Sequence, residues 1–285
     1  KSLSSRHSIK LLCELFNIQR STYYANAKRN ISRHIQRDMY LKGLIKDIYL
    51  RHKRRSGASK IKKELFEQNQ NVSMKKIFQL MHELDLKTFT PKRNAYIGKS
   101  KRGSIQMPNL LKQKFIQKAP NLVWVSDITE TKIKQRPVYL CVIMDLFSRK
   151  IIAHKVSRKN KTRLVMMTFN QALINRDAKP NMFHSDRGAQ YTSDIFKKHL
   201  EKLDINQSFS APGYPYDNAV VESFFASYKR ETIKMMLPFK LIKKYSMMVK
   251  TYIHYYNDTR LHKTLGLITP NKKEAIYYQI SISPI

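Results

Sequence analysis

The fold is decided by a run in which apolar residues lead into a turn, Phe183-His184-Ser185-Asp186-Arg187-Gly188-Ala189-Gln190-Tyr191-Thr192-Ser193. Met182 and Phe183 precede Asp186, and Arg187-Gly188 follows it, which is the pattern of a strand that ends in a turn. A second run comes downstream and holds a Pro/Gly turn, Ser210-Ala211-Pro212-Gly213-Tyr214-Pro215-Tyr216-Asp217-Asn218-Ala219. Asn218 can cap a helix that carries Glu222 and, seven residues on, Lys229 on the same face.

A third carboxylate lies upstream inside an apolar run, Trp124-Val125-Ser126-Asp127-Ile128-Thr129. Residues 122–128 are largely β-branched or aromatic and predict a strand, with Asp127 near its C-terminal end. Two strand ends and a helix can therefore bring Asp127, Asp186 and Glu222 together. Any one of these acids, taken alone, could equally be a helix cap or half of an ion pair.

Three neighbouring carboxylates repel one another, so each tends to take up a proton unless a cation is present. Oxygen ligands suit Mg²⁺ or Mn²⁺ rather than zinc. Such a site can hold two metal ions roughly 3.5–4 Å apart for an in-line phosphoryl displacement. The residues alone thus indicate phosphoryl-transfer chemistry.

Composition indicates a polyanionic partner. The 285 residues include 55 Lys+Arg and 20 Asp+Glu, with a formal net charge of +35 and a pI near 10.2. A hydrophobic content of 42% indicates a folded protein rather than a basic tail. Cys13 and Cys141 form no Cys-x-x-Cys pair, so neither a disulfide framework nor a zinc finger is predicted. No run of about 18 apolar residues and no secretory signal is present, so we expect no membrane association.

The first 120 residues predict two small helical units and a linker. Residues 1–36 read as a helix-turn-helix-like segment, in which Ile9, Leu12, Leu15 and Phe16 mark one helix face. The second helix of such a motif offers its first side chains to a DNA groove, so Arg20 and Ser21 are candidate contacts; a plain helical hairpin is the alternative.

Residues 37–86 predict a second helical DNA-binding domain, with Ser73 as a helix N-cap and Lys60 as a candidate DNA contact. Residues 87–120 predict a basic linker that follows a DNA backbone or serves only as a solvated tether.

The remaining chain predicts a core at 121–235 and a helical C-terminal extension at 236–285. Its expected strands are 138–144, 150–156 and 205–209, and its expected helices are 162–175 and 193–203. A stripe at near-helical spacing in the tail of the chain is read as core packing: Met235, Met236, Leu237, Leu241, Tyr245, Met248 and Tyr252. Asp145 is a further carboxylate at the end of a strand.

At the two runs quoted above, and through Glu222-Ser223-Phe224-Phe225, the sequence closely resembles bacterial insertion-sequence transposases of the two-frame, copy-out–paste-in type, which are relatives of retroviral integrases. The segment Tyr256-Asn257-Asp258-Thr259-Arg260-Leu261-His262, which leads to Leu265-Gly266 and Thr269-Pro270, resembles the closing motif of that family. The resemblance covers about residues 5 to 275. One departure is Ser56-Gly57, where the family has Tyr-Gly.

The resemblance implies an α/β fold: a ribonuclease-H-like mixed-sheet core flanked by helices and preceded by small all-α, helix-turn-helix-like domains. It identifies Asp127, Asp186 and Glu222 with the catalytic Asp-Asp-Glu triad, which holds Mg²⁺ (or Mn²⁺), two ions per active site. It makes Asp145 structural, in the turn between two strands. His184 is expected to orient or pack rather than to transfer protons.

The resemblance also implies DNA contacts. Lys229 matches a DNA-contacting lysine of the family, and the other candidates in the core are Arg187, Gln190, Asn218, Arg260 and His262. For Arg260 and His262 a structural role is an equal alternative. The expected partners are double-stranded DNA, as terminal inverted repeats and target, and further copies of the chain as a homo-oligomer on paired ends. The expected location is the bacterial cytoplasm, at the nucleoid.

The implied activity is cleavage that frees a 3′-hydroxyl at an element end, followed by attack of that hydroxyl on a phosphodiester. Two alternatives stay open: a ribonuclease-H-like nuclease without joining, and a catalytically silent DNA-binding regulator. The triad alone cannot separate joining from hydrolysis. In this family an upstream frame supplies a further helix-turn-helix and a leucine zipper, and this chain shows no sustained heptad repeat.

Overall fold

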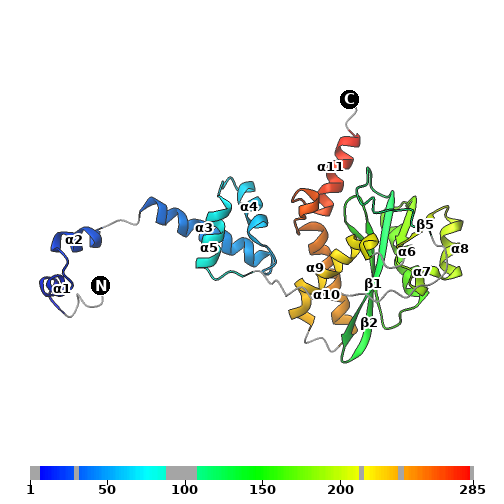
Figure 1. The fold of residues 1–285 in the computed structure, drawn as a ribbon, viewed down its shortest axis with the longest axis horizontal. Helices are drawn as coiled ribbons and strands as arrows, with labels where there is room; N and C mark the ends of the chain where they lie inside the picture. The colour runs from blue at the N-terminus through cyan, green and yellow to red at the C-terminus, as the bar shows by residue number, and fades with distance from the viewer. Residues whose placement is uncertain (1–6, 29–31, 88–107, 212–214, 237–240, 283–285) are drawn as a thin grey trace. The chain divides into compact units, whose positions relative to one another are not determined.

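The computed structural model describes residues 7–28, 32–87, 108–211, 215–236 and 241–282 (Figure 1). The chain divides into two compact units, Lys1–Thr88 and Phe89–Ile285. Three predicted features lie wholly or partly outside the described residues. They are most of the linker (88–107), the centre of the Pro/Gly turn (212–214) and residues 237–240 near the start of the predicted C-terminal extension.

Helices alone make up the described part of the first unit. They are α1 (Ile9–Leu15), α2 (Arg20–Lys28), α3 (Arg33–Arg51), α4 (Ala58–Glu67) and α5 (Met74–Glu83). The hydroxyl of Ser73 accepts a hydrogen bond from the Lys76 amide at 3.2 Å, which confirms the predicted N-cap of α5. Helices α3, α4 and α5 enclose an apolar core around Ile45, Ile61 and Leu80.

The predicted apolar face of α1 is wrong in detail. Leu15 and Phe16 are 73% and 56% exposed, and Cys13 is the residue of this helix that is buried. A helix of 7 residues paired with one of 9 offers too little surface to enclose a full apolar stripe.

A five-stranded sheet forms the centre of the second unit, in the order β3-β2-β1-β4-β5. The strands are β1 (Val123–Ile133), β2 (Arg136–Asp145), β3 (Ile151–Ser157), β4 (Met182–Ser185) and β5 (Asn206–Phe209). Strands β1, β2 and β3 pair antiparallel as a meander, whereas β4 is parallel to β1 and β5 is parallel to β4. The sheet is therefore mixed, as the resemblance implies.

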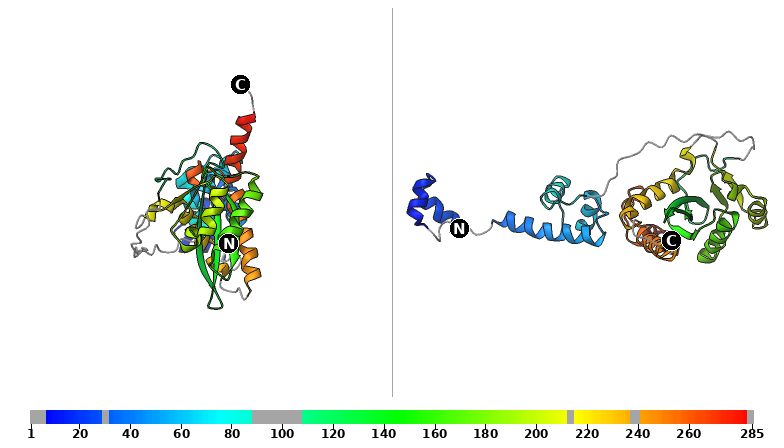
Figure 2. Two further views of the ribbon diagram at one scale, coloured as in Figure 1. Left: turned by 90° about the vertical axis from the view of Figure 1, so that its right-hand side faces the viewer. Right: turned by 90° about the horizontal axis from the view of Figure 1, so that it is seen from below.

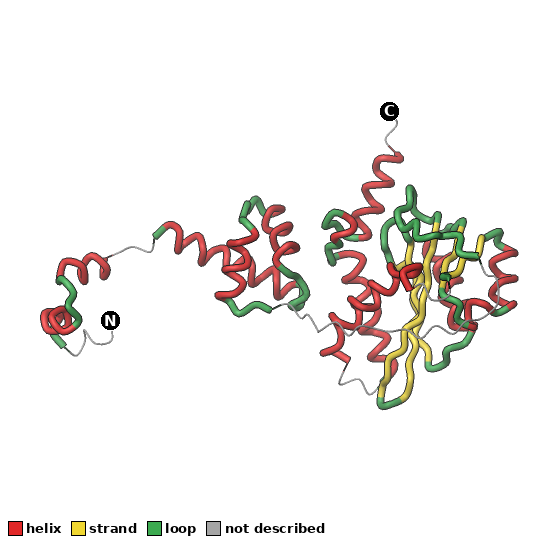
Figure 3. The backbone as a smooth tube through the Cα atoms, in the orientation of Figure 1, coloured by secondary structure: helices red, strands yellow, loops and turns green. Residues whose placement is uncertain are grey.

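Helices that lie between and after the strands in the sequence cover this sheet on both faces, as the tube in Figure 3 and the right-hand view of Figure 2 show. They are α6 (Thr162–Arg176), α7 (Ala189–Thr192), α8 (Asp194–Lys202), the 3₁₀ turn η1 (Pro215–Asn218), α9 (Ala219–Met236), α10 (Ile242–Asp258), the 3₁₀ turn η2 (Lys263–Leu265) and α11 (Pro270–Ile282). No described helix is both long and apolar enough to cross a membrane.

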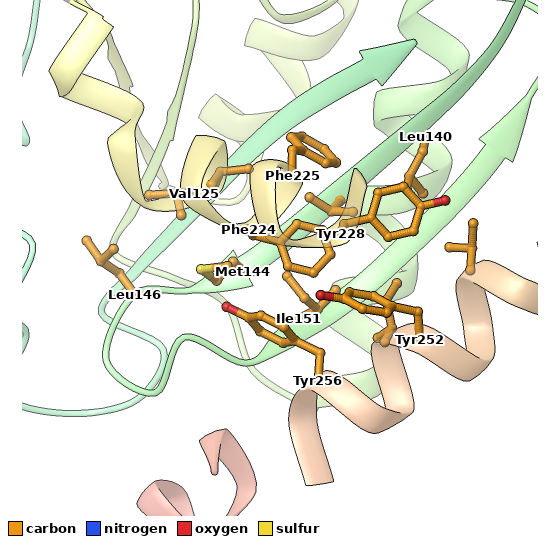
Figure 4. Packing of buried hydrophobic residues seen from close by; sticks show 14 of the residues in the cluster. Val125, Leu140, Met144, Leu146, Ile151, Phe224, Phe225, Tyr228, Tyr252 and Tyr256 are labelled. Carbon is orange, nitrogen blue, oxygen red and sulfur yellow. The ribbon is translucent and has the colours of Figure 1, made fainter. Parts of the chain in front are cut away.

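Each face of the sheet carries its own core, because successive side chains of a strand point to opposite faces. Val125 packs with Phe224 and Tyr252 in the cluster under α9 and α10 (Figure 4). Its neighbour Trp124 packs with Phe169 and Phe196 under α6 and α8. The predicted stripe is confirmed as core at Tyr245 and Tyr252 of α10, which are fully buried. It is wrong at Leu241, which caps the start of α10 and is 57% exposed.

Two polar connections fix the C-terminal helices to the sheet. The Asn257 amide pairs with both backbone groups of Ile151 at the start of β3, at 3.0 and 2.9 Å. Glu274 of α11 is buried and binds Arg176 of α6, with one N–O distance of 2.9 Å, and Lys150 at 3.0 Å.

Asp145 has the structural role that the resemblance implies. It is fully buried, accepts hydrogen bonds from the amides of Asn121 at 2.7 Å and Phe147 at 3.0 Å, and forms an ion pair with Arg176 at 3.3 Å. These contacts brace the turn between β2 and β3.

Candidate active site

Asp127 lies in the middle of β1, as the fifth of its 11 residues, rather than near the strand end that the sequence predicts. The strand continues because its second half pairs with β2 as far as Ile133 and Arg136. The Asp127 carboxylate accepts a hydrogen bond from the Ile128 amide at 2.7 Å. Its side chain is partly buried at the centre of the sheet.

Asp186 directly follows β4, and the pairing of β4 with β1 brings it to Asp127. The parallel ladder ends with Val125 opposite His184, so Asp127 and Asp186 each lie two residues beyond the last pair, at the same end of the ladder. The Gly188 amide donates to Asp186 Oδ1 at 3.0 Å. A Cβ atom at residue 188 would lie 3.1 Å from that oxygen and 2.8 Å from Gln190 Oε1, so a larger residue there would displace one or both side chains.

Glu222 lies in the first turn of α9, the helix that packs against β1, and its side chain is exposed. Burial raises the pKa of Asp127 to about 7, with the charge of Asp186 as the next cause and that of Glu222 a smaller one. Partial desolvation by the surrounding residues also raises the pKa values of Asp186 and Glu222, although both residues are exposed at the surface. Asp186 and Glu222 are therefore both close enough to Asp127 to act on it electrostatically.

The carboxylates fit a hard divalent cation in chemistry, since all three supply oxygen and a cation would relieve their mutual repulsion. Within the described residues, however, no three His, Cys, Asp or Glu side chains stand close enough together to hold a metal ion as they are placed. Lys229 is exposed on α9, and its charge lowers the pKa of Asp127, so it lies near the same site.

The other predicted DNA contacts in the core have partners within the protein. Arg187 Nε donates to the Ser210 carbonyl at 2.9 Å, and Gln190 Nε2 to the Asn160 carbonyl at 3.4 Å. Asn218 is buried, and its amide donates to the Ser126 carbonyl at 3.2 Å, which joins the start of α9 to β1 next to Asp127.

Arg260 and His262 also have structural contacts. Arg260 binds Glu231 of α9 at 2.9 Å, with both side chains largely buried, and its guanidinium lies over the Tyr256 ring. His262 is buried and its Nε2 lies 3.2 Å from the Tyr256 carbonyl. These contacts favour the structural alternative, and the DNA contact stays a prediction.

In the first unit Arg20 and Ser21 are exposed on α2 and Lys60 is partly buried on α4, so their DNA contacts also stay predictions.

His184 has the orienting role that the sequence predicts. It is buried, and its ring nitrogens lie 2.8 Å from Ser208 Oγ and 3.3 Å from Ser210 Oγ. Burial lowers the pKa of His184 to about 4, so the ring is neutral near pH 7. A neutral ring between two hydroxyls fixes β4 to β5 and to the residue that follows it.

Two residues beside the site were missed by sequence reasoning. Tyr191 of α7 is buried, and its hydroxyl lies 2.8 Å from Ser126 Oγ, which joins the turn after Asp186 to the residue before Asp127. Asp217 is a buried fourth acid at the start of α9. No local pattern reveals the partners of either residue. The one available signal was that Tyr191 and Asp217 lie inside the two runs quoted for the family resemblance.

Models of known protein families match parts of both units. A model described as an integrase core domain matches residues 117–215, a second of the same description matches 203–270, and an HTH-like domain matches 36–94. The transposase for insertion sequence element IS904 of Lactococcus lactis subsp. lactis (strain IL1403) is 34% identical over 250 residues, which span 87% of this chain and 98% of that protein. The chain belongs to the family of insertion-sequence transposases with an integrase core.

Transposase InsF for insertion sequence IS3A of Escherichia coli (strain K12) is another relative, at 30% identity over 94% of each chain. Among solved structures, the core domain of HTLV-2 integrase in complex with magnesium is similar with a TM-score of 0.46 and 20% identity, over 55% of this chain and 97% of that one. The catalytic core of BIV integrase is similar with a TM-score of 0.44 and 18% identity, over 57% and 99%. The mixed sheet flanked by helices agrees with the ribonuclease-H-like core that the family resemblance implies.

Proposed function

We propose that this transposase catalyses divalent-metal-dependent cleavage at the 3′ ends of an insertion element and transfer of those ends to DNA. The observation that supports the proposal best is the pairing of β1 with β4. It sets Asp127 beside Asp186, at a position where burial and the Asp186 charge raise the pKa of Asp127 to about 7. Buried acids with strongly perturbed pKa values are typical of functional sites.

In this proposal Asp127, Asp186 and Glu222 hold Mg²⁺ or Mn²⁺, two ions per active site. When bound, the cations supply charge stabilisation to the attacking and leaving oxygens of an in-line phosphoryl displacement. The Asp127 carboxylate gives up its proton to become a ligand, and the Gly188 amide orients the Asp186 carboxylate. The exposed ammonium group of Lys229 contacts a DNA phosphate at the edge of the site.

The partners proposed are double-stranded DNA, as terminal inverted repeats and target, and further copies of the chain on paired ends. The charge of +35 supplies sequence-independent affinity for the DNA backbone. Residues 1–36 and 37–86 would then select the ends, 87–120 would follow the backbone, and 121–235 with 236–285 would carry out the chemistry. We infer that the protein acts in the bacterial cytoplasm, at the nucleoid.

The test is a strand-transfer assay with a labelled duplex of the element's terminal inverted repeat, Mg²⁺ or Mn²⁺, and the Glu222→Gln variant. Glu201→Gln is the matched control, because Glu201 is an exposed acid on α8. We expect metal-dependent joined products from wild type and Glu201→Gln and none from Glu222→Gln. Cleavage without joining would instead indicate a nuclease, and DNA binding without any chemistry would indicate a regulator.

A further inference from the structure

Asp217 is a fourth carboxylate near the proposed site, in the 3₁₀ turn that leads into α9. Its side chain is 2% exposed and accepts three hydrogen bonds. The donors are Asn109 Nδ2 at 2.7 Å, Gln113 Nε2 at 2.9 Å and the Ala211 amide at 2.8 Å. Both oxygens therefore face N–H groups, and N–H groups around a carboxylate repel a cation. Asp217 is unsuited to bind a metal ion itself.

Two of these donors come from the leading segment, residues 108–113, which lies about a hundred residues earlier in the chain. The same segment is bound to β5, because the amides of Leu110 and Leu111 donate to Ser208 Oγ at 2.9 and 3.2 Å. The Leu111 side chain is buried in the cluster that contains Val221 and Phe224 of α9. The leading segment thus connects the strands next to Asp186 with the start of α9.

Glu222 follows Asp217 by five residues, so the orientation of the Glu222 carboxylate depends on where the first turn of α9 begins. We propose that Asp217 is a positioning residue for Glu222, and that the leading segment is the part of the chain against which it fixes α9. This inference rests on the proposed function, in which Glu222 is a metal ligand. Residues behind a ligand set its orientation, and their loss typically weakens metal affinity by about 10–100-fold.

The experiment measures Mn²⁺ binding to the full chain by calorimetric titration, without DNA, and the half-saturating Mn²⁺ concentration for joining. Asp217→Asn keeps the shape of the side chain but turns an amide group toward the N–H donors. We expect it to bind Mn²⁺ about tenfold more weakly. Asp204→Asn is the control, because Asp204 is exposed and its positive φ of 53° is one that asparagine tolerates.

A second pair of variants tests the same contact from the other side. These variants are Asn109→Ala and Gln113→Ala, and each removes one N–H donor to Asp217 without changing any proposed metal ligand. We expect each to weaken Mn²⁺ binding. Combined with Asp217→Asn they should weaken Mn²⁺ binding little further, because each removes a hydrogen bond to the same carboxylate. Gln113→Ala is the cleaner of the two, since Asn109→Ala also removes the oxygen that accepts from the Lys112 amide at 2.9 Å. Hydrogen exchange at the amides of Leu110, Leu111 and the first turn of α9 should rise in each variant, while β1 and β2 stay protected.

A folded Asp217→Asn protein that binds Mn²⁺ as tightly as wild type would overturn the inference. If Asp217→Asn does not fold, unchanged Mn²⁺ binding in the Asn109→Ala, Gln113→Ala double variant has the same meaning. Unchanged Mn²⁺ binding and joining in Glu222→Gln would overturn the triad assignment as well. If Glu222→Gln loses Mn²⁺ binding and joining while Asp217→Asn keeps both at the wild-type level, the positioning role of Asp217 alone would be overturned.

Discussion

At the scale of single residues, protons and metal ions compete for Asp127. Its folded-state pKa of about 7 exceeds the ordinary aspartate value of about 3.9, because burial and the Asp186 charge disfavour the ionised form. The contribution of Asp127 to the free energy of unfolding is therefore most favourable below about pH 4, where the carboxyl group is protonated in both states. This contribution is lost as the pH rises through the folded-state pKa of about 7. Each pKa unit corresponds to about 1.4 kcal/mol.

We predict that Asp127→Asn raises the melting temperature of the metal-free protein at pH 8, by about 2–4 °C for each kcal/mol recovered. The difference from wild type should vanish near pH 4. Adding Mn²⁺ should stabilise wild type at pH 8 and have little effect on the variant. Thermal melts at both pH values measure this, and an Asp127→Asn protein that is less stable than wild type at pH 8 would contradict it.

Gly188 gives a second prediction at this scale. A Cβ atom there would meet Asp186 Oδ1 and Gln190 Oε1, whereas the backbone φ of −58° suits alanine. Gly188→Ala should therefore displace the Asp186 carboxylate and lower the rate of joining by about tenfold or more, with a change in stability within about 1 kcal/mol. Gly43→Ala is the control, because nothing lies within 4 Å of its Cβ position.

If Gly188→Ala joins DNA at the wild-type rate, the prediction is wrong. Either the Asp186 carboxylate tolerates the displacement, or the Gln190 side chain moves instead. Gly43→Ala should join normally and become more stable by up to about 1 kcal/mol, since it lies inside α3.

At the scale of elements, a buried ion network holds α11 against the core. Burial acts to raise the pKa of Glu274, but its bonds with Arg176 outweigh this and lower the pKa. Removing one partner of a buried pair costs about 3–5 kcal/mol when the other charge is left uncompensated. Arg176 keeps Asp145 as a partner at 3.3 Å, so we expect a smaller cost here, of about 2–3 kcal/mol. We predict that Glu274→Ala lowers the free energy of unfolding by that amount. Urea unfolding measures it, with exposed Glu201→Ala as the control; a loss below about 1 kcal/mol would show that α11 is not fixed by this network.

Local sequence patterns predicted the strands, the helices and the three acids, because apolar periodicity and an acid in an acid-poor chain are both visible within a few residues. They failed where distant partners decide. Asp127 lies in mid-strand because β1 extends as far as its pairing with β2 allows. Glu274 and Asp217 are bound by groups 98 and 108 residues away, and no local pattern reveals such partners.

At the scale of the whole molecule, the net charge of +35 leads to a prediction about salt. Each phosphate that a protein neutralises releases condensed counterions, so affinity falls steeply as salt rises. If the chain makes six to ten phosphate contacts, its affinity for a random duplex should fall about 10³–10⁵-fold between 50 and 200 mM salt. Fluorescence anisotropy with a labelled duplex of unrelated sequence measures this slope.

The same titration tests individual side chains. Lys229→Gln should reduce the magnitude of the slope by about one, as expected for the loss of a single phosphate contact. Glu201→Gln should leave the slope unchanged, since Glu201 carries no positive charge to release counterions. Arg260 is bound to Glu231 inside the protein, so Arg260→Gln should leave the slope unchanged in any fraction that folds. A wild-type slope shallower than about two would mean that the positive charge is not used to bind DNA, and an Arg260→Gln slope reduced by one would restore Arg260 as a DNA contact.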